Sequence, residues 1–278
     1  MNTIFHHLRI RNLLIWMVIS GLIFLIISAS IFLTSEYLGS LLLSLTTTTM
    51  FTFWLCLYIT PVLWLLIKLK KNHFTFNVFF RSNRTVSIGN IIALTFMLYI
   101  FIHGMAYLWE GIKTWSIGLT EPAVLPPGTS NGLLKILSII TFVLIAPICE
   151  EIIFRGILLG RLTAKYNLNI GIISSSFVFG FLHTDFVSFT LFGILLSLLF
   201  IKSNSLMGPI IVHISFNTTS VILDHYYLLA NLPKGFISNL QLMHIFIIAM
   251  ILILISLSWM IPFLKKNWPL VNRKGCPL

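Results

Sequence analysis

Residues 146–156 read APICEEIIFRG and place two adjacent glutamates and an arginine inside a long apolar stretch. Glu151 and Arg155 are four residues apart, so on a helix they share one face and can form an ion pair. Glu150 is rotated about 100° from Glu151, and one arginine does not easily neutralise both carboxylates. An ion pair with a snorkelling arginine at a helix end would explain Glu151 and Arg155. Because ionisable groups at membrane depth usually mark function, Glu150 is predicted to face a functional site.

The composition of the chain is that of an integral membrane protein. Of its 278 residues, 58% are hydrophobic and only 9% are charged, whereas soluble domains carry about 25% charged residues. The net charge of +11 does not indicate nucleic-acid binding, because the basic residues lie between hydrophobic runs, as they do in cytoplasmic loops. Three scattered cysteines are too few for a disulfide framework or a CxxC metal site.

Hydropathy predicts an all-α, polytopic bundle of about eight transmembrane helices, since about 20 apolar residues cross the hydrocarbon core. The predicted spans are 13–34, 43–67, 87–109, 133–158, 168–184, 187–201, 207–223 and 240–264. The fifth to seventh are short and closely joined, so seven spans remain an alternative. We divide the chain into an N-terminal three-span section, 1–130, a core with the polar motifs, 131–230, and a last helix with a basic tail, 231–278.

Charge counts predict the orientation of the bundle. With the N-terminus in the cytoplasm, 15 of the 18 basic residues fall on the inner side, and only Lys113, Lys135 and Lys234 fall outside. The positive-inside rule therefore predicts cytoplasmic N- and C-termini. In this arrangement Glu150 is expected near the cytoplasmic end of the fourth span.

Two further spans carry polar pairs at helical spacing. Residues 174–186, SSSFVFGFLHTDF, place Phe179 and His183 on one face, and residues 208–220, GPIIVHISFNTTS, do the same for His213 and Asn217. A carboxylate, two imidazoles and an amide can activate water and stabilise an oxyanion. Glu150, His183 and His213 could alternatively be three zinc ligands with an open position. The span boundaries put His183 near the outer end of its helix, at a different depth from Glu150.

These motifs resemble those of a known family. EEIIFR (150–155), FGFLH (179–183) and HISFN (213–217) are similar to the Glu-Glu-x-x-x-Arg, Phe-x-x-x-His and His-x-x-x-Asn motifs of the CPBP family. This family comprises CAAX proteases and bacteriocin-processing enzymes and is also called Abi. The resemblance covers roughly residues 135–225 and implies an eight-helix bundle with a cavity in the membrane.

The resemblance also implies roles for the motif residues. Glu150 and His183 would activate water for attack on a peptide bond, and His213 and Asn217 would stabilise the oxyanion. Glu151, Arg155 and Phe179 would support the site, and His183 would reach the depth of Glu150. No metal cofactor is expected on this basis.

We therefore expect an intramembrane endopeptidase of the CPBP type that cleaves a peptide or a membrane-anchored protein, in a bacterial cell membrane. The alternative is a non-catalytic membrane partner, or a bacteriocin-immunity-type factor, that regulates another envelope protein. In that case the same polar residues would form a structural hydrogen-bond network. The two hypotheses differ in whether the basicity of Glu150 is needed.

Overall fold

The fold is a bundle of helices, as predicted. The computed structural model describes residues 60–68, 70, 71, 80, 87–117, 132–226 and 239–269, together with 11, 12, 15, 18, 19, 22 and 26. Within these residues there is no β-strand. Four of the described helices are long and apolar enough to cross a membrane, so the predicted all-α membrane bundle is confirmed. The predicted spans 13–34 and 43–67 lie largely outside the described residues, although residues 60–68 are helical.

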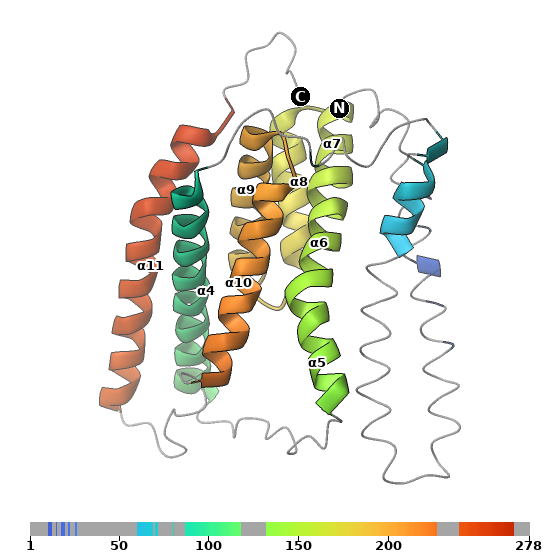
Figure 1. Ribbon diagram of the computed structural model, residues 1–278. Helices are drawn as coiled ribbons and strands as arrows, with labels where there is room; N and C mark the ends of the chain where they lie inside the picture. Colours follow the sequence, from blue (N-terminus) through green and yellow to red (C-terminus); the bar gives the residue numbers. More distant parts are fainter. Residues whose placement is uncertain are drawn as a thin grey trace, which may run out of the picture.

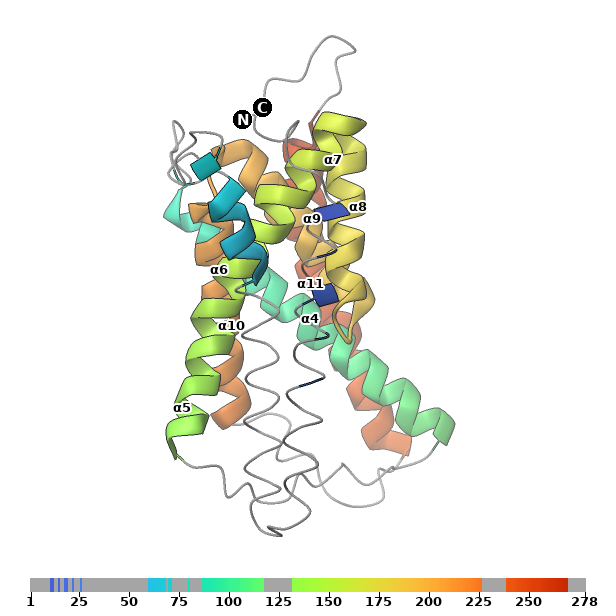
Figure 2. The same cartoon turned by 90° about the vertical axis from the view of Figure 1, so that its right-hand side faces the viewer.

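The last helix of the bundle lies against the third predicted span. α11 (Asn239–Asn267) packs along α4 (Ile88–Ile117), and α10 (Met207–Tyr226) contacts α4 as well. Figure 1 shows these helices as neighbours, and Figure 2 shows that α4 is tilted relative to the helices of the core. Gly104 permits the close approach of α4 and α11, because a Cβ there would lie 3.0 Å from the Ile253 side chain.

The fourth predicted span is one continuous helical rod from Gly132 to Lys165. It consists of α5 (Gly132–Ile140), η2 (Thr141–Ile145), α6 (Ala146–Glu151), η3 (Ile152–Leu159) and α7 (Gly160–Lys165), where η2 and η3 are π-helical. Such wide turns are frequent at functional sites. Here they lie directly before and after the segment that carries the two glutamates.

This rod corrects the predicted depth of Glu150. The helix continues to Lys165 rather than ending near residue 158, so Glu150 lies near the middle of the membrane-crossing segment, 136–165, and not near its end. The apolar run that defined the prediction ends before Arg161, but the helix extends further. Long basic side chains can extend from a membrane helix to the interface, so the basic residues did not mark the helix end.

The next helix, α8 (Leu168–Phe181), runs back alongside the rod after a tight turn. Asn167 caps it, since its side-chain oxygen accepts a hydrogen bond from the N–H of Ile170 over 2.9 Å. Glu150 precedes Tyr166 by 16 residues, and His183 follows Asn167 by 16 residues. With about 1.5 Å of rise per residue on both sides, the two side chains come to similar depths. The expected depth mismatch is therefore wrong.

Helix α9 (Phe186–Ser203) packs closely against α8 and leads through a short turn into α10. A Cβ on Gly193 would lie 2.9 Å from the Cβ of Ser176, so glycine permits the two helices to approach at this point. The turn between α9 and α10 contains Asn204 in the left-handed conformation, with φ of 51°. The six predicted spans from 87–109 onward thus correspond to described helices.

Candidate active site

The predicted ion pair between Glu151 and Arg155 is present and fully buried. Arg155 Nη1 donates to Glu151 Oε1 over 2.8 Å, and the two side chains are 1% and 0% exposed. Arg155 Nη2 also donates to the Gly193 carbonyl over 3.4 Å, and the guanidinium carbon lies 4.5 Å from the centre of the Phe179 ring. The snorkelling arginine considered from the sequence is therefore wrong: Arg155 is enclosed between α8 and α9.

His213 lies against both glutamates. Its Nδ1 is 2.8 Å from Glu151 Oε1, and its Nε2 is 3.8 Å from Glu150 Oε2. Because the ionised carboxylate paired with Arg155 only accepts hydrogen bonds, Nδ1 carries the hydrogen and donates it to Glu151. His213 therefore presents Nε2 to Glu150. Glu150 and Glu151 from α6 and His213 from α10 thus form one connected network.

Glu150 is a buried carboxylate, 7% exposed, in the interior of the bundle. Its position beside His213 agrees with the prediction that it faces away from Arg155 and toward other polar groups. Burying a carboxylate is costly unless other polar groups surround it. The imidazole of His213 supplies such a group for Glu150, while Arg155 pairs with Glu151.

His183 occupies the turn between α8 and α9, on the same side of the bundle interior. Its Nδ1 donates to the Phe179 carbonyl over 2.7 Å. Its ring lies 4.5 Å from the Phe179 ring and 4.2 Å from the Phe189 ring. His183 is close enough to Glu150 and His213 for electrostatic interaction with both. The structure thus brings together the carboxylate and the two imidazoles that the sequence motifs singled out.

Asn217 lies one helical turn after His213 and contacts the π-helical segment η2. Its Nδ2 donates to the Phe142 carbonyl over 2.8 Å. In η2 the N–H of Ala146 bonds to the carbonyl of Thr141, five residues earlier. The next residue is Pro147, which has no N–H to donate to Phe142 in the same register. The proline therefore leaves this carbonyl available to Asn217, which links α10 to the rod.

Aromatic rings surround the polar network. Phe192 lies 4.9 Å from His213, measured between ring centres, and 5.2 Å from Phe216. Phe179 packs edge-on against Phe154 at 5.0 Å and stacks with Phe192 at 5.9 Å. These rings come from η3, α8, α9 and α10 and are all buried. A low-dielectric surrounding of this kind strengthens the electrostatic interactions within the network.

The zinc hypothesis concerns Glu150, His183 and His213. Among the residues that the structure describes, no three histidine, cysteine, aspartate or glutamate side chains are arranged to hold a metal ion. In addition, His213 Nδ1 is engaged by Glu151, so only its Nε2 could serve as a ligand.

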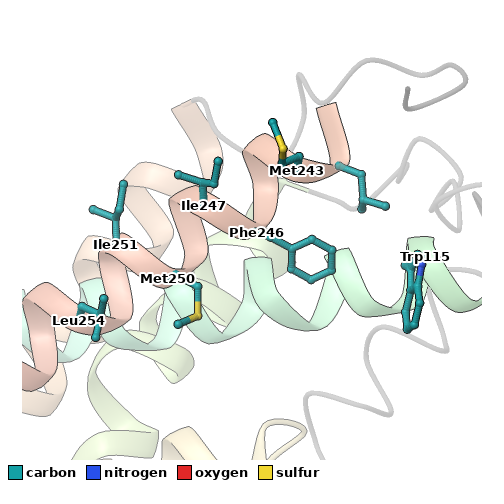
Figure 3. A pocket seen from close by; sticks show the side chains of 8 residues that line it. Trp115, Met243, Phe246, Ile247, Met250, Ile251 and Leu254 are labelled. Atoms are coloured by element: carbon teal, nitrogen blue, oxygen red, sulfur yellow. The ribbon is translucent and has the colours of Figure 1, made fainter. Parts of the chain in front are cut away.

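An open apolar groove lies elsewhere. Figure 3 shows it on α11 and the end of α4, where Trp115, Phe246 and Met250 are among the side chains that line it. Its lining has no titratable side chain. This groove is therefore not a candidate for the chemistry and is a surface on the outer side of the α4–α11 pair.

Sequence reasoning missed three residues that shape the site: Pro147, Phe189 and Gly193. A proline in the interior of the predicted span 133–158 was a usable signal, because proline disrupts helical hydrogen bonding. Phe189 and Gly193 carried no such signal, since phenylalanine and glycine are common throughout this chain.

Comparisons with known proteins agree with the resemblance seen in the motifs. Residues 132–219 match the model of a family described as type II CAAX prenyl endopeptidase Rce1-like. A putative membrane peptidase, YdiL, of Bacillus subtilis strain 168 is 36% identical over 91 residues. That alignment covers 32% of this chain and 37% of the Bacillus protein. No solved structure gives a significant match.

Proposed function

We propose that this chain, whose residues 132–219 match the model of the Rce1-like family of CAAX endopeptidases, is an intramembrane endopeptidase. The observation that carries the proposal is the position of Glu150: a buried carboxylate near the middle of the candidate membrane span 136–165, beside the imidazole of His213 and within electrostatic range of His183. A carboxylate with imidazole partners in a low-dielectric site is a suitable general base.

In the proposed reaction, Glu150 and His183 bind a water molecule between them. Glu150 takes one proton from this water as the water oxygen attacks the carbonyl carbon of the substrate peptide. The carbonyl oxygen becomes an oxyanion, and the C–N bond then breaks as the leaving nitrogen takes up the proton held by Glu150. His183 has Nδ1 bonded to Phe179, which leaves Nε2 to accept a hydrogen bond from the water.

The oxyanion needs hydrogen-bond donors, and His213 and Asn217 are the candidates. His213 lies between two carboxylates, and in the proposal its Nε2, the nitrogen on the side of Glu150, carries the hydrogen that is donated to the oxyanion. Asn217 uses one N–H for the Phe142 carbonyl and retains a second N–H. Removing one such donor typically lowers kcat about 100- to 1000-fold.

The substrate is proposed to be a peptide or a membrane-anchored protein that enters the bundle from the bilayer.

Basic residues gather at one end of the described bundle. Lys202, Lys265 and Lys266 lie at the ends of α9 and α11, near the end of the rod that carries Lys165. This basic end is proposed to face the cytoplasm of a bacterial cell.

The proposed chemistry uses no metal ion. This part of the proposal is tested by measuring cleavage after dialysis against a chelator and after adding Zn²⁺. Unchanged rates support hydrolysis by Glu150 and His183 alone. Loss of activity on chelation and recovery with Zn²⁺ would instead support the zinc alternative with His213.

The direct test compares membranes that contain the wild-type protein with membranes that contain Glu150→Gln. This change keeps the size of the side chain and some of its hydrogen bonding but removes its basicity. N-terminal proteomics should find substrate fragments only with the wild type, at equal protein levels. His183→Gln should behave like Glu150→Gln, whereas His244→Gln on the exposed side of α11 should not affect cleavage.

A non-catalytic role remains the second candidate because of one feature of the site. His213 and Asn217 already bond to Glu151 and to the Phe142 carbonyl, so these groups also serve as links between helices. A regulatory partner needs such links but not a base. If Glu150→Gln retains the full cellular function of the protein, the endopeptidase proposal is wrong and the partner role is supported.

A further inference from the structure

Besides the tilted Phe179 ring at 4.5 Å, two contacts in perpendicular directions hold the imidazole of His183. In the plane of its ring, Nδ1 donates to the Phe179 carbonyl over 2.7 Å. Against its face, the Phe189 ring lies parallel to it, with an interplanar angle of 14° and a distance of 4.2 Å between ring centres. The hydrogen bond fixes one edge of the ring, and the stacked phenyl ring limits rotation of the imidazole out of this plane.

Phe189 reaches this position because the turn between α8 and α9 is tightly built. Asp185 caps α9: its Oδ1 accepts from the Ser188 N–H over 3.1 Å, and its carbonyl accepts from the Phe189 N–H over 3.0 Å. Gly180, at the end of α8, has no Cβ that would collide with α9. A Cβ there would lie 2.7 Å from the Phe186 carbonyl oxygen. The first turn of α9 is therefore pressed against the end of α8, next to His183.

Other aromatic rings support Phe189 in turn. Its ring centre lies 5.9 Å from that of Phe192 and 6.4 Å from that of Phe216. Both rings are buried and belong to α9 and α10, and Phe192 also lies 4.9 Å from His213. Phe189 thus connects His183 with the packed interior of the bundle.

We infer that Phe189 is a positioning residue for His183, which holds the imidazole so that Nε2 can bind the attacking water. The inference rests on the proposed function, in which His183 acts on that water. Phe189 lies outside the three sequence motifs, six residues after His183. Aromatic pairs contribute about 0.5–1.5 kcal/mol beyond buried area, which corresponds to a change of roughly 2- to 10-fold in rate.

The kinetic test uses purified Phe189→Leu and a cleavable peptide substrate. Leucine fills part of the space but cannot stack, so kcat should fall roughly 2- to 10-fold while KM changes little. Phe189→Tyr keeps the ring and should retain the wild-type kcat. Phe186→Leu is the matched control: Phe186 is in the same turn of α9 and packs against Phe177 rather than His183. Adding Phe189→Leu to His183→Gln should lower the rate no further.

A second measurement does not depend on catalysis. In NMR spectra of detergent-solubilised protein labelled at histidine, the His183 ring protons should be shifted upfield by the stacked ring. Phe189→Leu should reduce this shift to the part that comes from the Phe179 ring, and Phe186→Leu should preserve it in full. A His183 signal that is unchanged in Phe189→Leu would overturn the inference, even for a variant with poor activity.

The two proposals fail in distinguishable ways. Normal cleavage by His183→Gln would overturn the proposed function. Loss of cleavage in His183→Gln together with a wild-type kcat in Phe189→Leu would overturn only the role of Phe189. If Phe189→Tyr lowers kcat as much as Phe189→Leu does, the loss reflects general destabilisation. This outcome would also count against positioning by stacking.

Discussion

His213 donates its Nδ1 hydrogen to Glu151 over 2.8 Å and so joins α10 to α6 in the interior of the bundle. The same carboxylate oxygen accepts from Arg155, also over 2.8 Å. Glu151 therefore orients an imidazole and an arginine together. This arrangement leaves the opposite nitrogen of His213 facing Glu150, the residue to which we assign the chemistry.

The buried pair of Glu151 and Arg155 makes Arg155→Met strongly destabilising. The substitution leaves Glu151 buried without its counter-ion, and breaking a buried pair in this way costs about 3–5 kcal/mol. Unfolding in mixed detergent, followed by circular dichroism, measures the loss. Lys266→Met, at the exposed end of α11, is the control and should change stability by less than about 0.5 kcal/mol. Equal stability of the two variants would contradict this account of the ion pair.

Pro147 is expected to control the contact between Asn217 and η2. In Pro147→Ala the backbone gains an N–H that can donate to the Phe142 carbonyl and compete with Asn217. We expect the folded state to be as stable as the wild type or more stable, because alanine favours a helix. Cleavage should nevertheless fall, because Asn217 loses its anchor.

The measurement for this variant is kcat together with thermal stability. Asn217→Ala provides the comparison, since it removes the amide itself and should lower kcat more than Pro147→Ala does. If Pro147→Ala is less stable but cleaves at the wild-type rate, Pro147 serves the fold and does not position Asn217.

Gly193 is expected not to tolerate a side chain. In Gly193→Ala the new Cβ would lie 2.9 Å from the Cβ of Ser176, so α8 and α9 would have to separate. Overpacking of this kind costs typically about 1–3 kcal/mol. The shift would also move the carbonyl that accepts from Arg155. Gly89→Ala near the start of α4, where the nearest atom would be 3.5 Å away, is the matched control and should be neutral.

The proposed orientation is tested by labelling single cysteines in a cysteine-free background. Lys202→Cys at the end of α9 should react with a membrane-impermeant maleimide only after the cells are opened. Ser116→Cys, near the C-terminal end of α4 and on the other side of the bundle, should react in intact cells. Both side chains are exposed, so burial does not decide the result. The reverse pattern would place the basic end outside the cell.

The sequence alone was sufficient to predict the class of fold. A run of apolar residues has one low-energy state in a bilayer, a helix with all of its backbone bonds satisfied, and six predicted spans match described helices. The pairing of Glu151 with Arg155 was predictable as well, because both residues lie on the same helix and their spacing fixes their geometry.

Relationships between helices could not be obtained in this way. The position of Glu150 along its helix depended on where the rod ends, and apolar runs do not mark helix ends. Tertiary packing brings His213 to two glutamates that lie 62 and 63 positions earlier in the chain. A turn brings Phe189 onto His183, six positions earlier. Such contacts depend on how closely helices approach, which is set here by residues as ordinary in sequence as Gly180 and Gly193. Local spacing therefore determined which side chains share a helix face, and helix packing decided which of these faces meet.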